Sequence, residues 1–153
     1  MHELTIVDAH KGLVNKDFTC RELVDACLLN IDKHNDTLNA FITVLHESAR
    51  AEAQLVDDKI AKGEEIGTLE GIPYGLKDII MAEDVRATAG SNILRDFIAP
   101  LDATVTKRLR EAGAILIGKE NCDSFGHGAS TENSDFGVVK NAWATSRVAG
   151  GSS

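Results

Sequence analysis

A single lysine among apolar residues is the first candidate for chemistry in this sequence. Lys77 lies in the run "YGLKDI". Burial penalises the charged form of a lysine, so a buried Lys77 would be mainly neutral and able to act as a general base. The alternative is an ordinary surface lysine at the edge of a strand.

Two serines behind two glycines are the second candidate. The run Gly150–Gly151–Ser152–Ser153 closes the sequence. Paired glycines let a backbone take up tight turns that present the following side chains. A serine hydroxyl is a weak nucleophile until a base activates it. The alternative is a flexible linker, which has the same composition.

A third segment, "GASTENSDFG" from Gly128 to Gly137, concentrates short polar side chains between glycines. It is either a set of side-chain-stabilised turns or a loop that lines a polar pocket. Asp123 and Glu132 are weak candidates for an acid–base pair, because nine residues of expected loop separate them. His127 has no histidine or cysteine nearby at ligand spacing, so we expect no metal site.

Regular elements can be placed around these segments, and they predict an α/β fold. Thr19 and Glu22 form a capping-box pattern at the start of one helix, and Asp102 is the expected N-cap of a later one, with Val105, Leu109 and Ala112 facing inward. The buried run "AILIG" that follows is typical of a parallel α/β unit. The predicted helices cover 19–35, 47–63 and 102–113, and the predicted strands lie at 39–45, within 71–80 and at 114–118.

Composition limits the class of protein. Hydrophobic residues make up 43% of 153 residues, which is typical of a folded globular domain. The net charge of −8 argues against a nucleic-acid-binding surface. The odd number of cysteines without a close pair indicates reduced thiols in a cytoplasmic protein, and no apolar run is long enough to suggest a membrane helix.

The order of these segments resembles the amidase signature family. Within it, the chain is most similar to the A subunits of glutamine-dependent aspartyl/glutamyl-tRNA amidotransferases. Ala142 and Ala149 depart from the family pattern, which usually has proline at both positions. The resemblance covers nearly the whole chain and is carried by "LNAFITV", "EGIPYGLKDII", "DATVTKRLREAGAILIGKENCDSFGHGASTENSDFG" and "KNAWATSRVAGGSS".

The resemblance implies a mixed-sheet α/β/α fold of which residues 1–153 are the N-terminal portion. Residues 1–65 would be a mainly helical lead-in, and residues 66–153 would be the α/β part. It also implies a Ser–Ser–Lys triad in which Lys77 is the base and Ser152, after a cis peptide bond, is the bridging serine. The nucleophilic serine and the oxyanion hole would follow Ser153, so this chain alone is expected to be inactive. The implied substrate-binding residues are Ser130, Thr131, Gly150 and Gly151.

The activity implied for the complete subunit is release of ammonia from glutamine. In the complex, the B and C subunits would be its partners, and misacylated Glu-tRNA(Gln) or Asp-tRNA(Asn) would bind through one of these partners. ATP and Mg²⁺ would be used by the complex, with no cofactor on this chain. Two alternatives stay open: a stand-alone amidase acting on a small amide, and a non-catalytic fragment that binds a partner.

Overall fold

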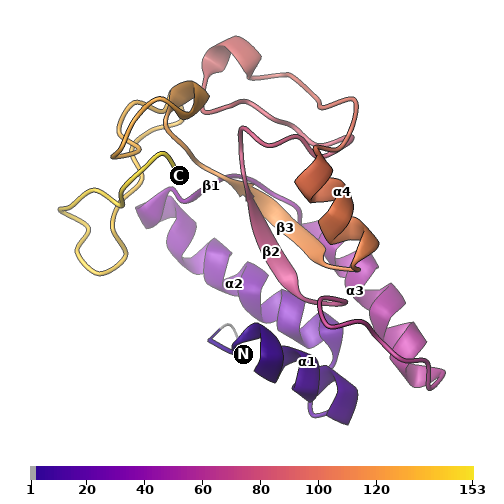
Figure 1. The fold of residues 1–153 in the computed structure, drawn as a ribbon. Helices are drawn as coiled ribbons and strands as arrows, with labels where there is room; N and C mark the ends of the chain where they lie inside the picture. The colour runs from indigo at the N-terminus through magenta and orange to yellow at the C-terminus, as the bar shows by residue number, and fades with distance from the viewer. Residues whose placement is uncertain (1–2) are drawn as a thin grey trace. The chain divides into compact units, whose positions relative to one another are not determined.

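The computed structural model describes residues 3–153 and has the α/β architecture that the sequence predicts (Figure 1). Three helices and one short strand come first, and two longer strands lie beyond residue 72 with a helix between them. The elements are α1 (Ile6–Asn15), α2 (Cys20–Leu38), β1 (Phe41–Val44), α3 (His46–Ala61), β2 (Pro73–Lys77), η1 (Asn92–Leu94), α4 (Thr104–Glu111), β3 (Ile115–Glu120) and η2 (Ser124–Gly126).

A mixed three-stranded sheet has the strand order β1-β3-β2. β1 runs antiparallel to β3. Ile115 N–H donates to Ile72 O and Asp78 N–H donates to Glu120 O, both at 2.9 Å, so β2 and β3 run in the same direction. The first five residues of β3 are buried. The parallel arrangement predicted for the "AILIG" run is therefore confirmed.

Side chains from two elements satisfy the first amide groups of α2. Thr19 and Glu22 form the predicted capping box, with Thr19 N–H on Glu22 Oε2 at 2.8 Å and Glu22 N–H on Thr19 Oγ1 at 3.0 Å. Asp57 of α3 adds a cap that the sequence did not reveal, because its carboxylate accepts from Cys20 N–H at 2.7 Å and from Arg21 N–H at 3.0 Å. The start of α2 is thus fixed both locally and by α3.

α4 differs from the sequence-based expectation. It begins at Thr104, so Ala103 and not Asp102 directly precedes it. The Asp102 carboxylate accepts from Glu83 N–H at 2.7 Å. Thr106 is the buried residue of this helix, and its hydroxyl donates to Met81 O at 2.7 Å. With the Thr106 face turned inward, Val105 is 46% exposed and Ala112 is also exposed. The prediction that these two residues face inward was wrong.

The chain divides into two compact units, each built from three stretches. The first contains residues 1–31, 45–74 and 108–117, and the second contains residues 32–44, 75–107 and 118–153. Both units therefore draw on residues from either side of position 65. The predicted division into 1–65 and 66–153 stays a prediction, and its residues 1 and 2 lie outside the described part of the chain.

The core of the first unit converges on Gly71. A Cβ atom at this position would lie 3.0 Å from Cys20 Sγ, 3.1 Å from Leu13 Cδ1 and 3.2 Å from Val56 Cγ1. Gly71 also has a φ of +81°, which side-chain-bearing residues rarely adopt. Close packing of α1, α2 and α3 here thus requires glycine.

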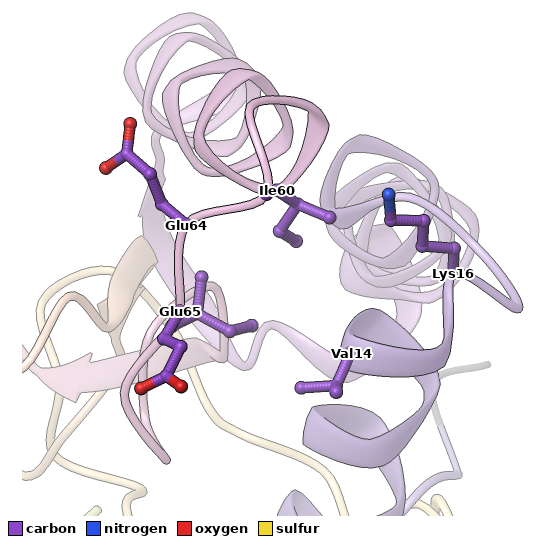
Figure 2. Close-up of a pocket in the computed structure, with 7 residues that line it drawn as sticks. Val14, Lys16, Ile60, Glu64 and Glu65 are labelled. Atoms are coloured by element: carbon purple, nitrogen blue, oxygen red, sulfur yellow. The ribbon is translucent and has the colours of Figure 1, made fainter.

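A cavity of about 380 Å³ opens in the first unit between the end of α1 and the segment after α3 (Figure 2). Val14 and Ile60 supply apolar surface, and the Glu64 carboxylate points away from Ile60. None of the residues that the sequence singled out for chemistry lines this cavity.

Two expectations drawn from composition concern the cysteines, expected to be reduced, and the apolar runs, expected to be too short for a membrane helix. Cys20, Cys27 and Cys122 are all free thiols. Burial, with the carboxylates of Asp57 and Glu70, raises the pKa of Cys20 to about 12. Within residues 3–153, no helix combines the length and apolar character needed to cross a bilayer.

We expect Asp57→Ala to destabilise the protein by about 1–2 kcal/mol, because two amide groups at the start of α2 lose their acceptor. Urea unfolding of the full-length protein measures this. Asp58→Ala is the matched control, since that carboxylate is exposed and accepts from the Gln54 side chain of its own helix. Equal losses from both substitutions would contradict the capping role of Asp57.

Candidate active site

The structure brings Lys77 and Ser152 together, although 75 positions separate them in the sequence. Lys77 is the last residue of β2, and its Nζ lies 2.5 Å from Ser152 Oγ. Lys77 is half-buried, as is Ser152, whereas Ser153 is exposed. A primary amine in hydrogen-bond contact with a hydroxyl is the arrangement that proton transfer between the two groups requires.

Backbone geometry and a backbone hydrogen bond define the loop that carries Ser152. The peptide bond between Gly151 and Ser152 is cis, and Gly150 has a φ of +110°. Ser152 O accepts from Asp123 N–H at 2.9 Å. Ser152 is thus fixed through its carbonyl as well as through its hydroxyl.

The residues expected to bind substrate gather around the same loop. The Thr131 hydroxyl donates to Gly150 O at 2.6 Å, and Thr131 is fully buried. A Cβ atom on Gly151 would lie 2.6 Å from Ser130 N, so this backbone also approaches closely. Thr131 therefore supports the loop from inside. A substrate contact by Ser130, Thr131, Gly150 or Gly151 stays a prediction.

The weaker candidates from the sequence do not form a site together. Asp123 is 1% exposed, while Glu132 and His127 are exposed. Neither oxygen of the Asp123 carboxylate has a hydrogen-bond partner within residues 3–153. Asp123 therefore contacts Ser152 through its backbone N–H, and its carboxylate is buried beside the loop that carries Ser152.

A second lysine, Lys119 of β3, is fully buried, and sequence reasoning missed it. It is 0% exposed, and its Nζ lies 3.5 Å from the Asp78 carboxylate. Burial lowers the pKa of Lys119, and Asp78 opposes that shift. The signal was present in the sequence, because Lys119 follows "AILIG" just as Lys77 follows "GIPYGL".

The pKa of the Cys122 thiol depends on its burial and on Asp78, Lys77 and Lys119 nearby. Burial raises its pKa and Asp78 raises it further, while Lys77 and Lys119 act in the opposite direction. The two lysines and Asp78 thus belong to one electrostatic environment. Among the residues that the structure describes, no group of three or more histidine, cysteine or acidic side chains could hold a metal ion.

Comparison with known proteins gives this geometry its context. A family model described as amidase matches residues 22–153, which is most of the chain. The chain belongs to the amidase family. Lys77, Ser152 and the loops that join them all lie in the matched region.

Among similar sequences, the A subunit of the glutamyl-tRNA(Gln) amidotransferase of Alkaliphilus metalliredigens is 48% identical over all 153 residues. The match covers 31% of that protein, so the chain spans about a third of the length of the relatives it matches. Both Lys77 and Ser152 lie within this shared third.

Solved structures of amidases share the fold. The A subunit of the glutamyl-tRNA(Gln) amidotransferase of Thermotoga maritima matches with a TM-score of 0.79 at 33% identity, over 99% of this chain and 30% of that one. A bacterial aryl acylamidase of the amidase signature family matches with a TM-score of 0.93 at 25% identity, over 99% of this chain and 32% of that one.

We expect Gly128→Ala to destabilise the site loop, because the new Cβ atom would lie 2.2 Å from Asp123 Cγ. Forcing a methyl group into such a contact typically costs about 1–3 kcal/mol. Gly67→Ala is the control, since its nearest neighbour would be 3.8 Å away. Urea unfolding of both full-length variants tests this, and an undiminished stability of Gly128→Ala would show that the Asp123 carboxylate is not held against this loop.

Proposed function

We propose that the full-length protein is the glutaminase subunit of a tRNA-dependent amidotransferase. The Lys77–Ser152 contact carries the proposal, because it supplies a base and a bridging hydroxyl. The 48% identity to an amidotransferase A subunit, against 25% to an aryl acylamidase, favours this function over a stand-alone amidase.

In the proposed reaction, neutral Lys77 accepts a proton from Ser152 as Ser152 takes one from a nucleophilic serine later in the full-length chain. That serine attacks the side-chain amide carbon of glutamine. The proton held by this chain's residues then returns to the departing nitrogen, so that ammonia leaves and an acyl-enzyme remains. Water releases glutamate from the acyl-enzyme by the same proton route in reverse.

The proposed complex divides the remaining tasks among its subunits. Partners of the B and C type hold the misacylated Glu-tRNA(Gln) or Asp-tRNA(Asn), and the complex uses ATP and Mg²⁺ to activate it. No cofactor is assigned to this chain. Its net charge of −8 favours placing the tRNA on a partner, because phosphate binding needs clustered cations.

A stand-alone amidase is the second candidate function. The acylamidase fold matches with the higher TM-score of the two solved structures, so fold alone does not separate the candidates. The substrate that the full-length protein prefers separates them. The full-length protein should release ammonia from glutamine faster than it cleaves an aryl anilide, and the opposite preference would favour the stand-alone amidase.

Lys77→Ala should lower the glutaminase kcat of the full-length protein, assembled with its partner subunits, by at least about 100-fold. A positioned proton-transfer group contributes about 10²- to 10⁴-fold. Ammonia release under saturating glutamine measures the effect. Near-normal turnover would rule out Lys77 as the base.

Ser152→Ala should cause a comparable loss, whereas Ser153→Ala should change kcat by less than about tenfold. The reason is that Ser152 contacts Lys77, whereas the Ser153 residue is exposed. Ser153 is a matched control, because it is the same residue type one position away. The double variant Lys77→Ala/Ser152→Ala should be little worse than either single variant, since residues that act as a unit are not additive. Equal, mild effects of both serine substitutions would refute the assignment.

Residues 1–153 alone should release no ammonia from glutamine. The proposed nucleophile belongs to the part of the protein beyond them, and covalent catalysis needs that atom. Ammonia release by the purified fragment that persists after Ser152→Ala would contradict the proposed mechanism.

A further inference from the structure

Lys119 and Asp78 form an ion pair from which solvent is excluded. Both side chains are 0% exposed, and Lys119 Nζ lies 3.5 Å from Asp78 Oδ1. The same ammonium donates to Asp78 O at 3.2 Å and to Arg86 O at 3.4 Å. A buried ammonium is tolerated only when it is paired and hydrogen-bonded, and here three acceptors surround it.

Asp78 is also held through its other polar groups. Its Oδ2 atom accepts from Thr88 N–H at 2.8 Å, from the Thr88 hydroxyl and from Gly90 N–H at 3.4 Å. Its own N–H donates to Glu120 O at 2.9 Å. Both backbone groups and Oδ2 of Asp78 are therefore hydrogen-bonded, whereas Oδ1 has no hydrogen-bond partner within residues 3–153 and meets only the Lys119 ammonium, at 3.5 Å.

Asp78 directly follows Lys77, which contacts Ser152. β2 ends at Lys77, and Asp78 begins the turn that follows, in which Ile80 N–H donates to Lys77 O at 2.9 Å. The Asp78 side chain is held by buried Lys119, so the pair fixes the backbone directly after Lys77. The hydrogen bonds that Asp78 N–H and Asp78 O make with Glu120 and Lys119 of β3 also fix the position of the backbone at the end of β2, where Lys77 lies.

We propose that the Asp78–Lys119 pair is a positioning device for Lys77. This inference rests on the proposed function and deepens it. Lys119 and Asp78 touch neither Ser152 nor substrate; they act through the backbone that joins Asp78 to Lys77. The Lys119 ammonium is directed at Asp78 and Arg86. In this proposal Lys119 therefore positions the end of β2, while Lys77 accepts the proton.

Lys119→Met in the full-length protein, assembled with its partner subunits, tests the proposal. It keeps most of the length of the side chain and removes the charge, which leaves the Asp78 carboxylate buried without its cation. We expect kcat for glutamine, per folded molecule, to fall about tenfold or more while KM stays within about threefold. A split of this kind indicates displacement of the base, because a loss of substrate binding would raise KM.

The double variant Asp78→Asn/Lys119→Met replaces the ion pair with uncharged groups of similar size. It should recover part of the lost kcat, because no unpaired buried charge remains. It should stay below wild type, because the contacts of the ammonium with Asp78 O and Arg86 O are still missing. If Lys119→Met does not fold, the same kcat comparison between this double variant and wild type decides the question.

Lys59→Met is the matched control. Lys59 Nζ forms an ion pair with Glu70 Oε1 at 2.8 Å in the other compact unit. Its loss should lower stability slightly and leave kcat per folded molecule within about twofold. Thermal unfolding followed by circular dichroism gives the folded fraction of every variant.

Three results would overturn the proposal. They are wild-type kcat per folded molecule in the foldable Lys119 variants, an effect confined to KM, and a fall in kcat after Lys59→Met as large as that after Lys119→Met. Lys77→Ala, measured in parallel, separates the positioning role from the proposed function. If Lys77→Ala is inactive and Lys119→Met is not impaired, only the positioning role falls; if Lys77→Ala keeps its activity, the proposed function falls as well.

Discussion

The contact between Lys77 Nζ and Ser152 Oγ is the constraint on which the site depends, and neither residue can maintain it alone. Lys77 needs a fixed strand end, which β2 obtains from its hydrogen bonds with β3. Ser152 needs a fixed loop, which it obtains from Asp123 N–H at its carbonyl and from Thr131 at Gly150 O. The polar segment from Gly128 to Gly137 therefore has a structural task, since it supplies the buried hydroxyl that holds the serine loop.

Two buried carboxylates flank this contact in different ways. Asp78 has a cation on one oxygen and three hydrogen-bond donors on the other, so the cost of burying its charge is compensated. Asp123 is equally buried, but what it gives the site is its backbone N–H, with its carboxylate packed against Gly128 and Gly151. Glycine is required at those two positions because any side chain would enter the space of that carboxylate.

Local sequence patterns predicted the elements that local interactions stabilise. The capping box of Thr19 and Glu22 is confirmed, because both partners lie three residues apart on one helix turn. The Asp57 cap and the Asp78–Lys119 pair were missed, because their partners lie 37 and 41 positions away and no periodicity joins them. Asp102 shows the reverse failure, since a side chain of the right type for a cap is used by the more distant amide of Glu83. The site residues Lys77 and Ser152 came from family resemblance, which already encodes tertiary contacts.

Burial alone would have selected Lys119, and not Lys77, as the candidate base. A lysine in an apolar run is expected to become neutral when buried, yet Lys119 is the fully buried one and Lys77 is half-buried. Lys119 has a carboxylate and two carbonyl oxygens around its ammonium, and its hydrogens are directed at these groups. The Asp78 carboxylate opposes the lowering of the Lys119 pKa that burial causes. Lys77 has a hydroxyl as its contact, which can both accept and donate a proton. The partner that each amine meets, and not its burial, therefore separates the proposed proton-transfer lysine from the paired one.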